Sequence, residues 1–129
     1  MEIRLHKGQL RALKSKAKYV VVLAGTGSGK TFLGSVWVAK EIERGAKEIL
    51  VVSPTYLMFQ RVVLPHVMRF FKDTGLLEKY KGTDRVMELK TGTKIYFGSS
   101  DNPFSLEGVH VDAVWLDEAG QMKRAVSYT

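Results

Sequence analysis

The stretch that decides the fold is YVVVLAGTGSGKT, residues 19–31. Residues 19–23 form a continuous run of β-branched and apolar side chains, which is typical of a strand buried on both faces of a parallel sheet. Three glycines follow at alternate positions, and residues 31–44 then read as a helix. The apolar stripe expected for that helix consists of Phe32, Leu33, Val36, Trp37 and Ile42. A strand, a glycine-rich turn and a helix in this order predict an α/β fold.

Residues 24–31 nearly match the phosphate-loop pattern of glycine, four residues, glycine, lysine, and serine or threonine, with Ala24 at the first glycine position. The glycines let successive backbone N–H groups point at phosphate oxygens, and the helix that follows adds the positive end of its dipole. Lys30 would reach the β- and γ-phosphates, and the Thr31 hydroxyl would bind Mg²⁺. The pattern predicts a nucleotide site made of Gly25, Thr26, Gly27, Ser28, Gly29, Lys30 and Thr31.

Strands and helices continue to alternate after the phosphate loop, with Gly45 where the C-cap of the first helix is expected. Residues 49–52 indicate a second buried strand. Residues 56–72 are helical in pattern, although a proline at position 65 should kink or interrupt that helix. Residues 85–89 and 94–98 flank a Thr-Gly turn and predict a β-hairpin.

The two ends of the chain carry the remaining elements. Residues 7–17 are basic with leucines at roughly helical spacing, so they predict a short amphipathic helix. Residues 113–116 predict a last strand, and the chain stops soon after it. Only two or three parallel strands can be counted besides the hairpin. We therefore expect a parallel sheet with flanking helices that is incomplete at its C-terminal end.

Two carboxylates, Asp117 and Glu118, follow the last predicted strand. Ligands of open α/β sheets bind outside the carboxyl ends of the strands. Asp117 would hold Mg²⁺ there, and Glu118 would polarise the attacking water, so Glu118 and Lys30 are the predicted catalytic residues. A second carboxylate at this place separates ATPases that drive mechanical work from phosphate-loop kinases. Together with the phosphate loop, this pair predicts ATP and Mg²⁺ as the cofactors.

Composition sets wider limits. A chain of 129 residues is one domain in length, and its 45% hydrophobic and 26% charged residues exclude intrinsic disorder and coiled coil as descriptions of the whole. The net charge of +7 fits a polyanionic partner, although a basic solvated surface gives the same value. The absence of cysteine excludes disulfides and thiolate metal sites. With no bilayer-length apolar run and no apolar leader, we expect a cytoplasmic protein without a membrane segment.

Three segments resemble motifs I, Ia and II of helicase-like P-loop motor ATPases with the RecA/ASCE-like fold: residues 24–31, 52–55 with Gln60, and 117–119. A further run covers YFGSS at residues 96–100, PFSLEG at 103–108 and VDAVWLDEA at 111–119. This run resembles the ATPase domain of the large terminase subunit of tailed bacteriophages, the motor that packages DNA into procapsids. By this resemblance, residues 1–129 form the N-terminal portion of the ATPase domain, and the family's nuclease domain is absent.

The resemblance also implies partners and further site residues. It implies an ATPase that translocates double-stranded DNA as a homo-oligomeric ring, with the portal and the small terminase subunit, in the cytoplasm of a bacterial host cell. Gln9 is a candidate reader of the adenine edge. An arginine finger is expected to complete the site. The sequence does not choose among Arg61, Arg69, Arg85 and Arg124 for that role.

Two alternatives stay open. Many terminases carry an arginine within the phosphate loop, whereas this loop has Thr26 and Ser28 and is equally typical of superfamily 2 helicases. The chain would then be a helicase-like ATPase fragment. The second alternative is a nucleotide-binding remnant without turnover, because the family's coupling motif and further strands lie beyond these residues. We accordingly predict at most very slow hydrolysis by the isolated chain.

Overall fold

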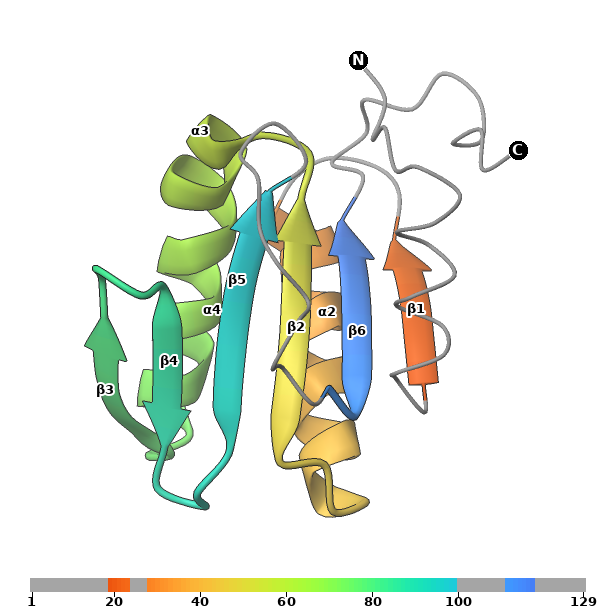
Figure 1. Ribbon diagram of the computed structural model, residues 1–129, viewed down its shortest axis with the longest axis vertical. Coiled ribbons are helices and arrows are strands. Elements are labelled where there is room, and N and C mark those ends of the chain that lie inside the picture. The colour runs from red at the N-terminus through yellow and green to blue at the C-terminus, as the bar shows by residue number, and fades with distance from the viewer. Residues whose placement is uncertain (1–18, 24–27, 100–110, 118–129) are drawn as a thin grey trace.

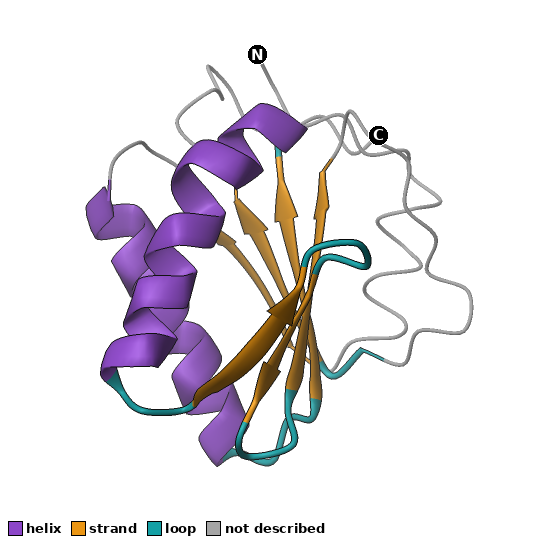
Figure 2. Cartoon of the chain, turned by 90° about the vertical axis from the view of Figure 1, so that its left-hand side faces the viewer, coloured by secondary structure: helices purple, strands orange, loops and turns teal. Residues whose placement is uncertain are grey.

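The computed structural model describes residues 19–23, 28–99 and 111–117 and shows an α/β architecture. A mixed six-stranded sheet carries its helices on one face (Figures 1 and 2). The elements in chain order are β1 (Tyr19–Leu23), α2 (Ser28–Glu43), β2 (Glu48–Ser53), α3 (Tyr56–Met58), the π-helical turn η1 (Phe59–Val63), α4 (Leu64–Asp73), β3 (Leu77–Lys81), β4 (Val86–Leu89), β5 (Lys94–Ser99) and β6 (Ala113–Asp117). Among the described helices, none has both the length and the hydropathy to cross a bilayer.

The strands are arranged in the order β1-β6-β2-β5-β4-β3. β1, β6, β2 and β5 run parallel, whereas β4 is antiparallel to β5 and β3 is antiparallel to β4. The predicted hairpin is confirmed as β4 and β5, and its turn contains Gly92 with a φ of 88°. The strand β3 was not predicted because LEKYK is mostly charged, which is common in an exposed edge strand.

Helix α2 begins three residues earlier than predicted and ends at a glycine cap, as expected. Gly45 has a φ of 104°. Its N–H donates to the carbonyl of Ile42 at 2.9 Å, and the N–H of Ala46 donates to the carbonyl of Glu41 at 3.0 Å. This pair of bonds is the Schellman motif, which satisfies carbonyls that the helix end would leave unpaired. The prediction of a C-cap at Gly45 is confirmed.

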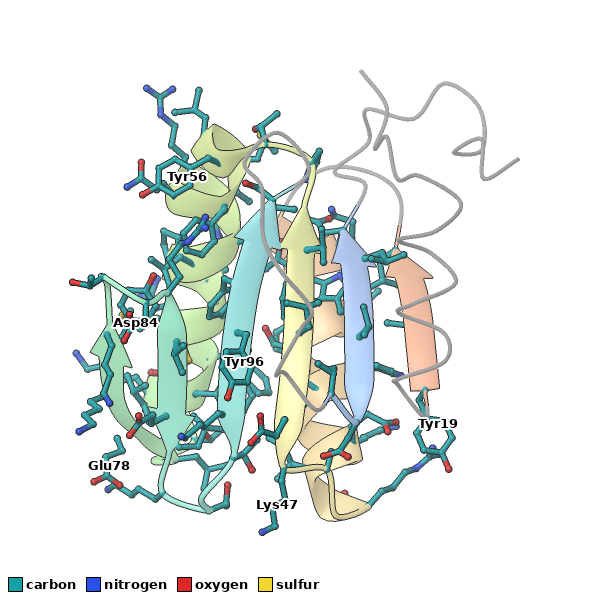
Figure 3. The ribbon with its side chains drawn as sticks, viewed as in Figure 1. Tyr19, Lys47, Tyr56, Glu78, Asp84 and Tyr96 are labelled. Carbon is teal, nitrogen blue, oxygen red and sulfur yellow. The ribbon has the colours of Figure 1, made fainter. Side chains whose placement is uncertain are left out.

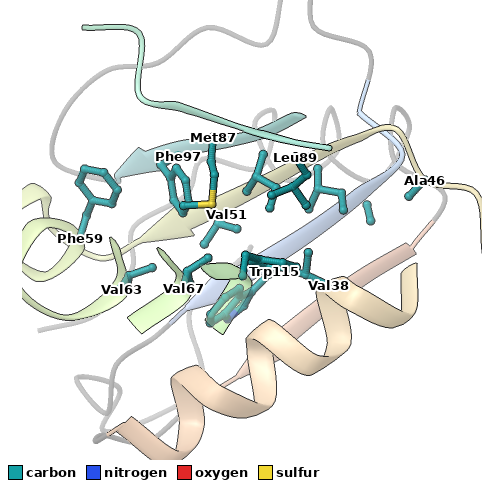
Figure 4. Packing of buried hydrophobic residues seen from close by; sticks show 14 residues of the cluster. Val38, Ala46, Val51, Phe59, Val63, Val67, Met87, Leu89, Phe97 and Trp115 are labelled. Carbon is teal, nitrogen blue, oxygen red and sulfur yellow. The ribbon is translucent and has the colours of Figure 1, made fainter. Parts of the chain in front are cut away.

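The buried face of α2 agrees only in part with the predicted stripe. Phe32 and Leu33 are exposed, at 58% and 60%, although the pattern placed them toward the core. Gly34 instead lies directly against the indole of Trp115. Trp115 is fully buried within the core (Figure 4). A Cβ atom at Gly34 would collide with that ring. The helix therefore approaches β6 closely at Gly34, while Trp37 and Ile42 of the predicted stripe are partly buried against the core.

The predicted helix 56–72 is confirmed, and Pro65 neither ends it nor leaves it regular. Thr55 caps its start, with its Oγ1 accepting from the N–H of Met58 at 3.0 Å. The helix then widens into η1, where the N–H of Leu64 donates to the carbonyl of Phe59, and α4 follows with Pro65 in its first turn. Proline has no N–H and is tolerated in a first turn. The irregularity expected at Pro65 is therefore taken up by one wide turn just before it.

The hydrophobic core lies between the helices and the sheet (Figure 4). Alternate strand residues face the helices, so Val51, Phe97 and Trp115 of three neighbouring strands lie in this layer. Fourteen buried residues make up the cluster, including Val38 of α2, Phe59 of η1 and Phe71 of α4. Leu50, Val52, Val114 and Leu116 point to the other face and are buried as well. This burial on both faces matches the continuous apolar runs of the central strands.

Candidate functional site

The four parallel strands all end at the same edge of the sheet, which we call the carboxyl edge. Their last residues are Leu23 of β1, Asp117 of β6, Ser53 of β2 and Ser99 of β5. Leu23 pairs with Asp117 and Ser53 pairs with Ser99, while Val52 pairs with Leu116 one step before Ser53 and Asp117. Paired residues of parallel strands point to the same face. Asp117, Ser53 and Ser99 therefore form one polar row on the face that carries α2.

The first turn of α2 brings Lys30 onto this row. The ammonium Nζ of Lys30 forms an ion pair with Oδ1 of Asp117. Both groups are buried, with side-chain exposures of 8% for Lys30 and 1% for Asp117. Removing two charges from water costs several kcal/mol per ion, so a buried pair is weak evidence for a purely structural role. Two residues that the sequence predicts to bind phosphate and metal thus lie in contact, although they are far apart in the chain.

Thr31 lies next to this ion pair and is fully buried. Its carbonyl accepts a hydrogen bond from the Ser35 hydroxyl at 3.0 Å, but its own Oγ1 has no hydrogen-bond partner. A buried polar atom left unpaired costs about 1–3 kcal/mol. Thr31 Oγ1 is thus an oxygen atom without a partner, one residue from the lysine that pairs with Asp117. Mg²⁺ binds oxygen atoms of this kind. The residues present therefore fit the metal that the sequence predicts.

The N-terminus of α2 adds a favourable field for an anion. The first turn contains no acidic side chain that would neutralise the positive end of the helix dipole. Gly29 is exposed within this turn, and a Cβ atom there would meet nothing within 4 Å. Backbone N–H groups at such a terminus bind phosphate directly. Ser28 and Gly29 form the start of α2, and their contact with phosphate stays a prediction.

Several predicted residues lie outside the described part of the chain. These are Gln9, Gly25, Thr26, Gly27 and Glu118, together with Arg124 and the predicted helix at residues 7–17. The structure thus brings together Lys30, Thr31 and Asp117. The other predicted contacts with nucleotide and water stay predictions.

Sequence reasoning missed the two serines of the carboxyl edge. Ser53 and Ser99 are each fully buried, and neither Oγ has a hydrogen-bond partner. The sequence shows both serines only as members of motifs, Ser53 within residues 52–55 and Ser99 within residues 96–100, and gives neither a role of its own. Their spacing could have indicated them. Each lies two residues after a core residue of its strand, Val51 or Phe97, and therefore points to the same face of the sheet.

Of the candidate arginines, Arg85 has the most distinctive surroundings. It immediately precedes β4 and has a φ of 55°, and its guanidinium lies 5.4 Å from the centre of the Tyr56 ring. Arg61 and Arg69 are exposed on the helix that follows Tyr56. The strand order places β4 three positions from β6, so Arg85 lies beside α3 rather than beside Lys30.

The opposite edge of the sheet, the amino edge, is held by Asp112. Its Oδ2 accepts from the N–H groups of Lys47 at 2.7 Å and Glu48 at 3.0 Å. Its own N–H donates to the carbonyl of Glu48 at 2.7 Å, and its carbonyl accepts from the N–H of Tyr19. One aspartate thus joins the starts of β1, β2 and β6.

Glu48 has a second partner on β5. The Tyr96 hydroxyl donates to Glu48 Oε1 at 2.8 Å (Figure 3). Burial, together with this hydrogen bond to a carboxylate and the negative charges of Glu48 and Glu88, raises the pKa of Tyr96 to about 12. The amino edge therefore carries charged and polar groups that are bonded to the protein itself.

Comparison with known proteins agrees with the motifs at the carboxyl edge. Residues 21–126 match the family described as "Terminase large subunit, T4likevirus-type, N-terminal". A relative from Bacillus subtilis (strain 168), the PBSX phage terminase large subunit, is 22% identical over 116 residues, which cover 81% of this chain and 25% of that protein. No solved structure matches the chain significantly. The family match spans most of the chain, and the chain therefore belongs to the terminase large subunits, whose N-terminal region it represents.

Proposed function

We propose that this chain is the ATP-binding part of a viral DNA-packaging motor, with a P-loop NTPase fold of the RecA/ASCE type. The observation that carries the proposal is the buried contact between Lys30 and Asp117, beside the unpaired hydroxyl of Thr31. A lysine at a helix start, a threonine after it and an aspartate at a strand end are the side chains that bind the phosphates and magnesium of a nucleotide. Membership of the terminase large subunits supports DNA packaging as the role of the whole protein.

The residues divide the binding of ATP–Mg²⁺ among them. Lys30 would exchange Asp117 for the β- and γ-phosphate oxygens, and Asp117 and Thr31 would hold the metal. Mg²⁺ of this kind is bound by one or two protein side chains together with phosphates and water. Bound Mg²⁺ would neutralise charge that develops on the phosphates. Glu118, the residue after Asp117, would orient and activate the attacking water.

The proposed role of the full-length protein goes beyond nucleotide binding. We propose that the full-length protein hydrolyses ATP to translocate double-stranded DNA into procapsids, as a ring that works with the portal and the small terminase subunit in the host cytoplasm. The chain covers 25% of the length of its curated relative, so the isolated chain should bind nucleotide and turn it over very slowly. Rapid, DNA-stimulated hydrolysis by the isolated chain, abolished in Glu118→Gln, would contradict that last expectation.

The test of the site is the affinity for ATP–Mg²⁺, measured by calorimetry on the purified chain. Lys30→Ala should weaken binding by about 100-fold or more, which corresponds to about 2.7 kcal/mol. Lys40→Ala is the matched control, because Lys40 is an exposed lysine in the last turn of the same helix and should leave affinity unchanged. Circular dichroism must show that both variants are folded. If Lys30→Ala retained the parent affinity, the assignment of the site would be wrong.

A further inference from the structure

The buried hydroxyl groups of this chain fall into two sets. Ser35 donates to the carbonyl of Thr31 at 3.0 Å, and Thr93 bonds the hydroxyl of Thr91 at 2.8 Å. The hydroxyls of Thr31, Ser53 and Ser99 have no partner. Among the described residues, the unpartnered buried hydroxyls therefore all lie at the carboxyl edge of the sheet or on the helix turn above it.

Their placement follows from the register of the strands. Ser53 lies beside Asp117, and Ser99 lies beside Ser53, each one strand further from Lys30. Neighbouring strands are about 4.8 Å apart, so the row extends about 10 Å from Asp117 to Ser99. Ser53 is within reach of a group that contacts both Lys30 and Asp117, whereas Ser99 is at the far end of the row.

An apolar side chain would fill both serine positions better if their role were only packing. The preceding residues on the same face of the two strands are Val51 and Phe97, which belong to the core. A hydroxyl that is buried without a partner destabilises the fold, and replacing it with an apolar group of similar shape is close to neutral or favourable. Such a group is retained at a functional site when a ligand completes its hydrogen bonds.

We propose that Ser53 and Ser99 bind the terminal-phosphate end of the nucleotide, so that this row distinguishes a triphosphate from a diphosphate. The inference rests on the proposed nucleotide site and adds two residues to it. Ser53 donates its hydroxyl hydrogen to a terminal phosphate oxygen, next to the charge of Lys30. Ser99, one strand further, donates at the outer side of the same group and contributes less. Thr31 keeps its separate role on the metal.

The experiment compares the dissociation constants for ATP–Mg²⁺ and ADP–Mg²⁺ in the parent chain, Ser53→Ala and Ser99→Ala. A hydrogen bond to a charged group is strong enough that its loss should weaken ATP binding by roughly tenfold in Ser53→Ala. Ser99→Ala should lose about threefold by the same reasoning. Affinity for ADP should change by less than about twofold in both variants, because ADP lacks the group that the serines contact.

Thr93→Ala is the matched control, since Thr93 is a buried hydroxyl at the hairpin end of the sheet. It should leave both dissociation constants unchanged and lower the melting temperature, because it loses a real hydrogen bond. Ser53→Ala should instead keep or raise the melting temperature of the nucleotide-free chain. This second readout separates the proposal from a structural role, in which Ser53→Ala would be destabilised without selective loss of ATP.

The remaining outcomes also decide the question. If Lys30→Ala abolishes binding while Ser53→Ala binds ATP as the parent does, this inference fails and the proposed nucleotide site stands. An equal loss for ATP and ADP in Ser53→Ala would overturn the placement at the terminal phosphate. If Lys30→Ala has no effect on binding, the nucleotide site and this inference both fail.

Discussion

The two edges of the sheet use polar residues in opposite ways. At the amino edge, Asp112 accepts from two backbone N–H groups, and Glu48 accepts from the Tyr96 hydroxyl. At the carboxyl edge, three buried hydroxyls have no partner, and a buried lysine meets a buried aspartate. Both edges belong to the same strands and share one core, so packing alone does not explain the contrast. Among the described residues, Asp112 and Glu48 of the amino edge are bonded within the protein, whereas the hydroxyls of Thr31, Ser53 and Ser99 have no partner, which supports the ligand site proposed at the carboxyl edge.

The largest expected effect comes from a substitution that shifts α2 but leaves the polar residues of the carboxyl edge unchanged. Gly34→Ala adds a Cβ atom that collides with the buried Trp115 ring, so α2 must shift away from β6. We expect the free energy of unfolding to fall by about 2–4 kcal/mol, the range of severe overpacking. Urea denaturation measures this change. Binding of ATP–Mg²⁺ should weaken as well, because the shift separates Lys30 from Asp117.

Gly29→Ala is the control for this change, since it makes the same substitution in the same helix. The added Cβ atom meets nothing within 4 Å. Removing a glycine from a helix favours the folded state by about 0.5–1 kcal/mol, so stability should rise or stay the same. Equal destabilisation by the two substitutions would show that the contact between Gly34 and Trp115 does not set the position of α2.

The next effect tests whether the amino edge is purely structural. Asp112→Ala removes the acceptor of the Lys47 and Glu48 N–H groups and should lower the free energy of unfolding by about 2 kcal/mol. Affinity for ATP–Mg²⁺ should stay within about twofold of the parent value once folding is secured, because the site lies at the other edge. Asp84→Ala, an exposed aspartate, should change stability by less than about 0.5 kcal/mol. A selective loss of nucleotide affinity in Asp112→Ala would remove the distinction between the edges.

The smallest effect concerns Tyr96 and depends on pH. Its pKa is raised to about 12 in the folded chain, so the folded state keeps the hydroxyl proton that an unfolded tyrosine loses near pH 10. The stability that Tyr96 adds is therefore fully present below about pH 10 and is lost as the pH rises toward 12. Tyr96→Phe should cost about 1 kcal/mol at about pH 8, and less at about pH 11. Urea denaturation at both values measures the difference.

Tyr19→Phe is the control for Tyr96, because Tyr19 is exposed and its ring still stacks on Arg44 after the hydroxyl is removed. Its effect on stability should be small and similar at both pH values. If the cost of Tyr96→Phe stayed constant from about pH 8 to about pH 11, the pKa of Tyr96 would not be raised in the folded chain.

The sequence predicted best what depends on neighbours along the chain. Continuous apolar runs identified β1, β2 and β6, turn chemistry identified the β4–β5 hairpin, and Gly45 was recognised as a C-cap. The strand β3 was missed because its charged residues have no apolar alternation. Of the stripe predicted for α2, Trp37 and Ile42 pack against the core, whereas Phe32 and Leu33 are exposed and were assigned to the wrong face.

Only the part of the candidate site that lies in local motifs could be predicted from the sequence. Lys30, Thr31 and Asp117 follow from motifs with fixed spacing, and the structure places them together. Ser53 and Ser99 could not be found in this way, since their alignment with Asp117 arises only when three strands pair in register. Residues whose role depends on non-local pairing leave almost no trace in a local pattern.

The wide turn η1 has a consequence for the length of its helix. A π turn holds one residue more than the regular helix around it. Deleting one residue there would restore regular geometry, and it would rotate the preceding turn by about 100° relative to α4. Tyr56 would then swing away from Arg85, and Phe59 would lose its place beside Phe97, where the ring centres are now 5.2 Å apart. The additional residue thus sets the rotational phase in which the segment after β2 meets the hairpin.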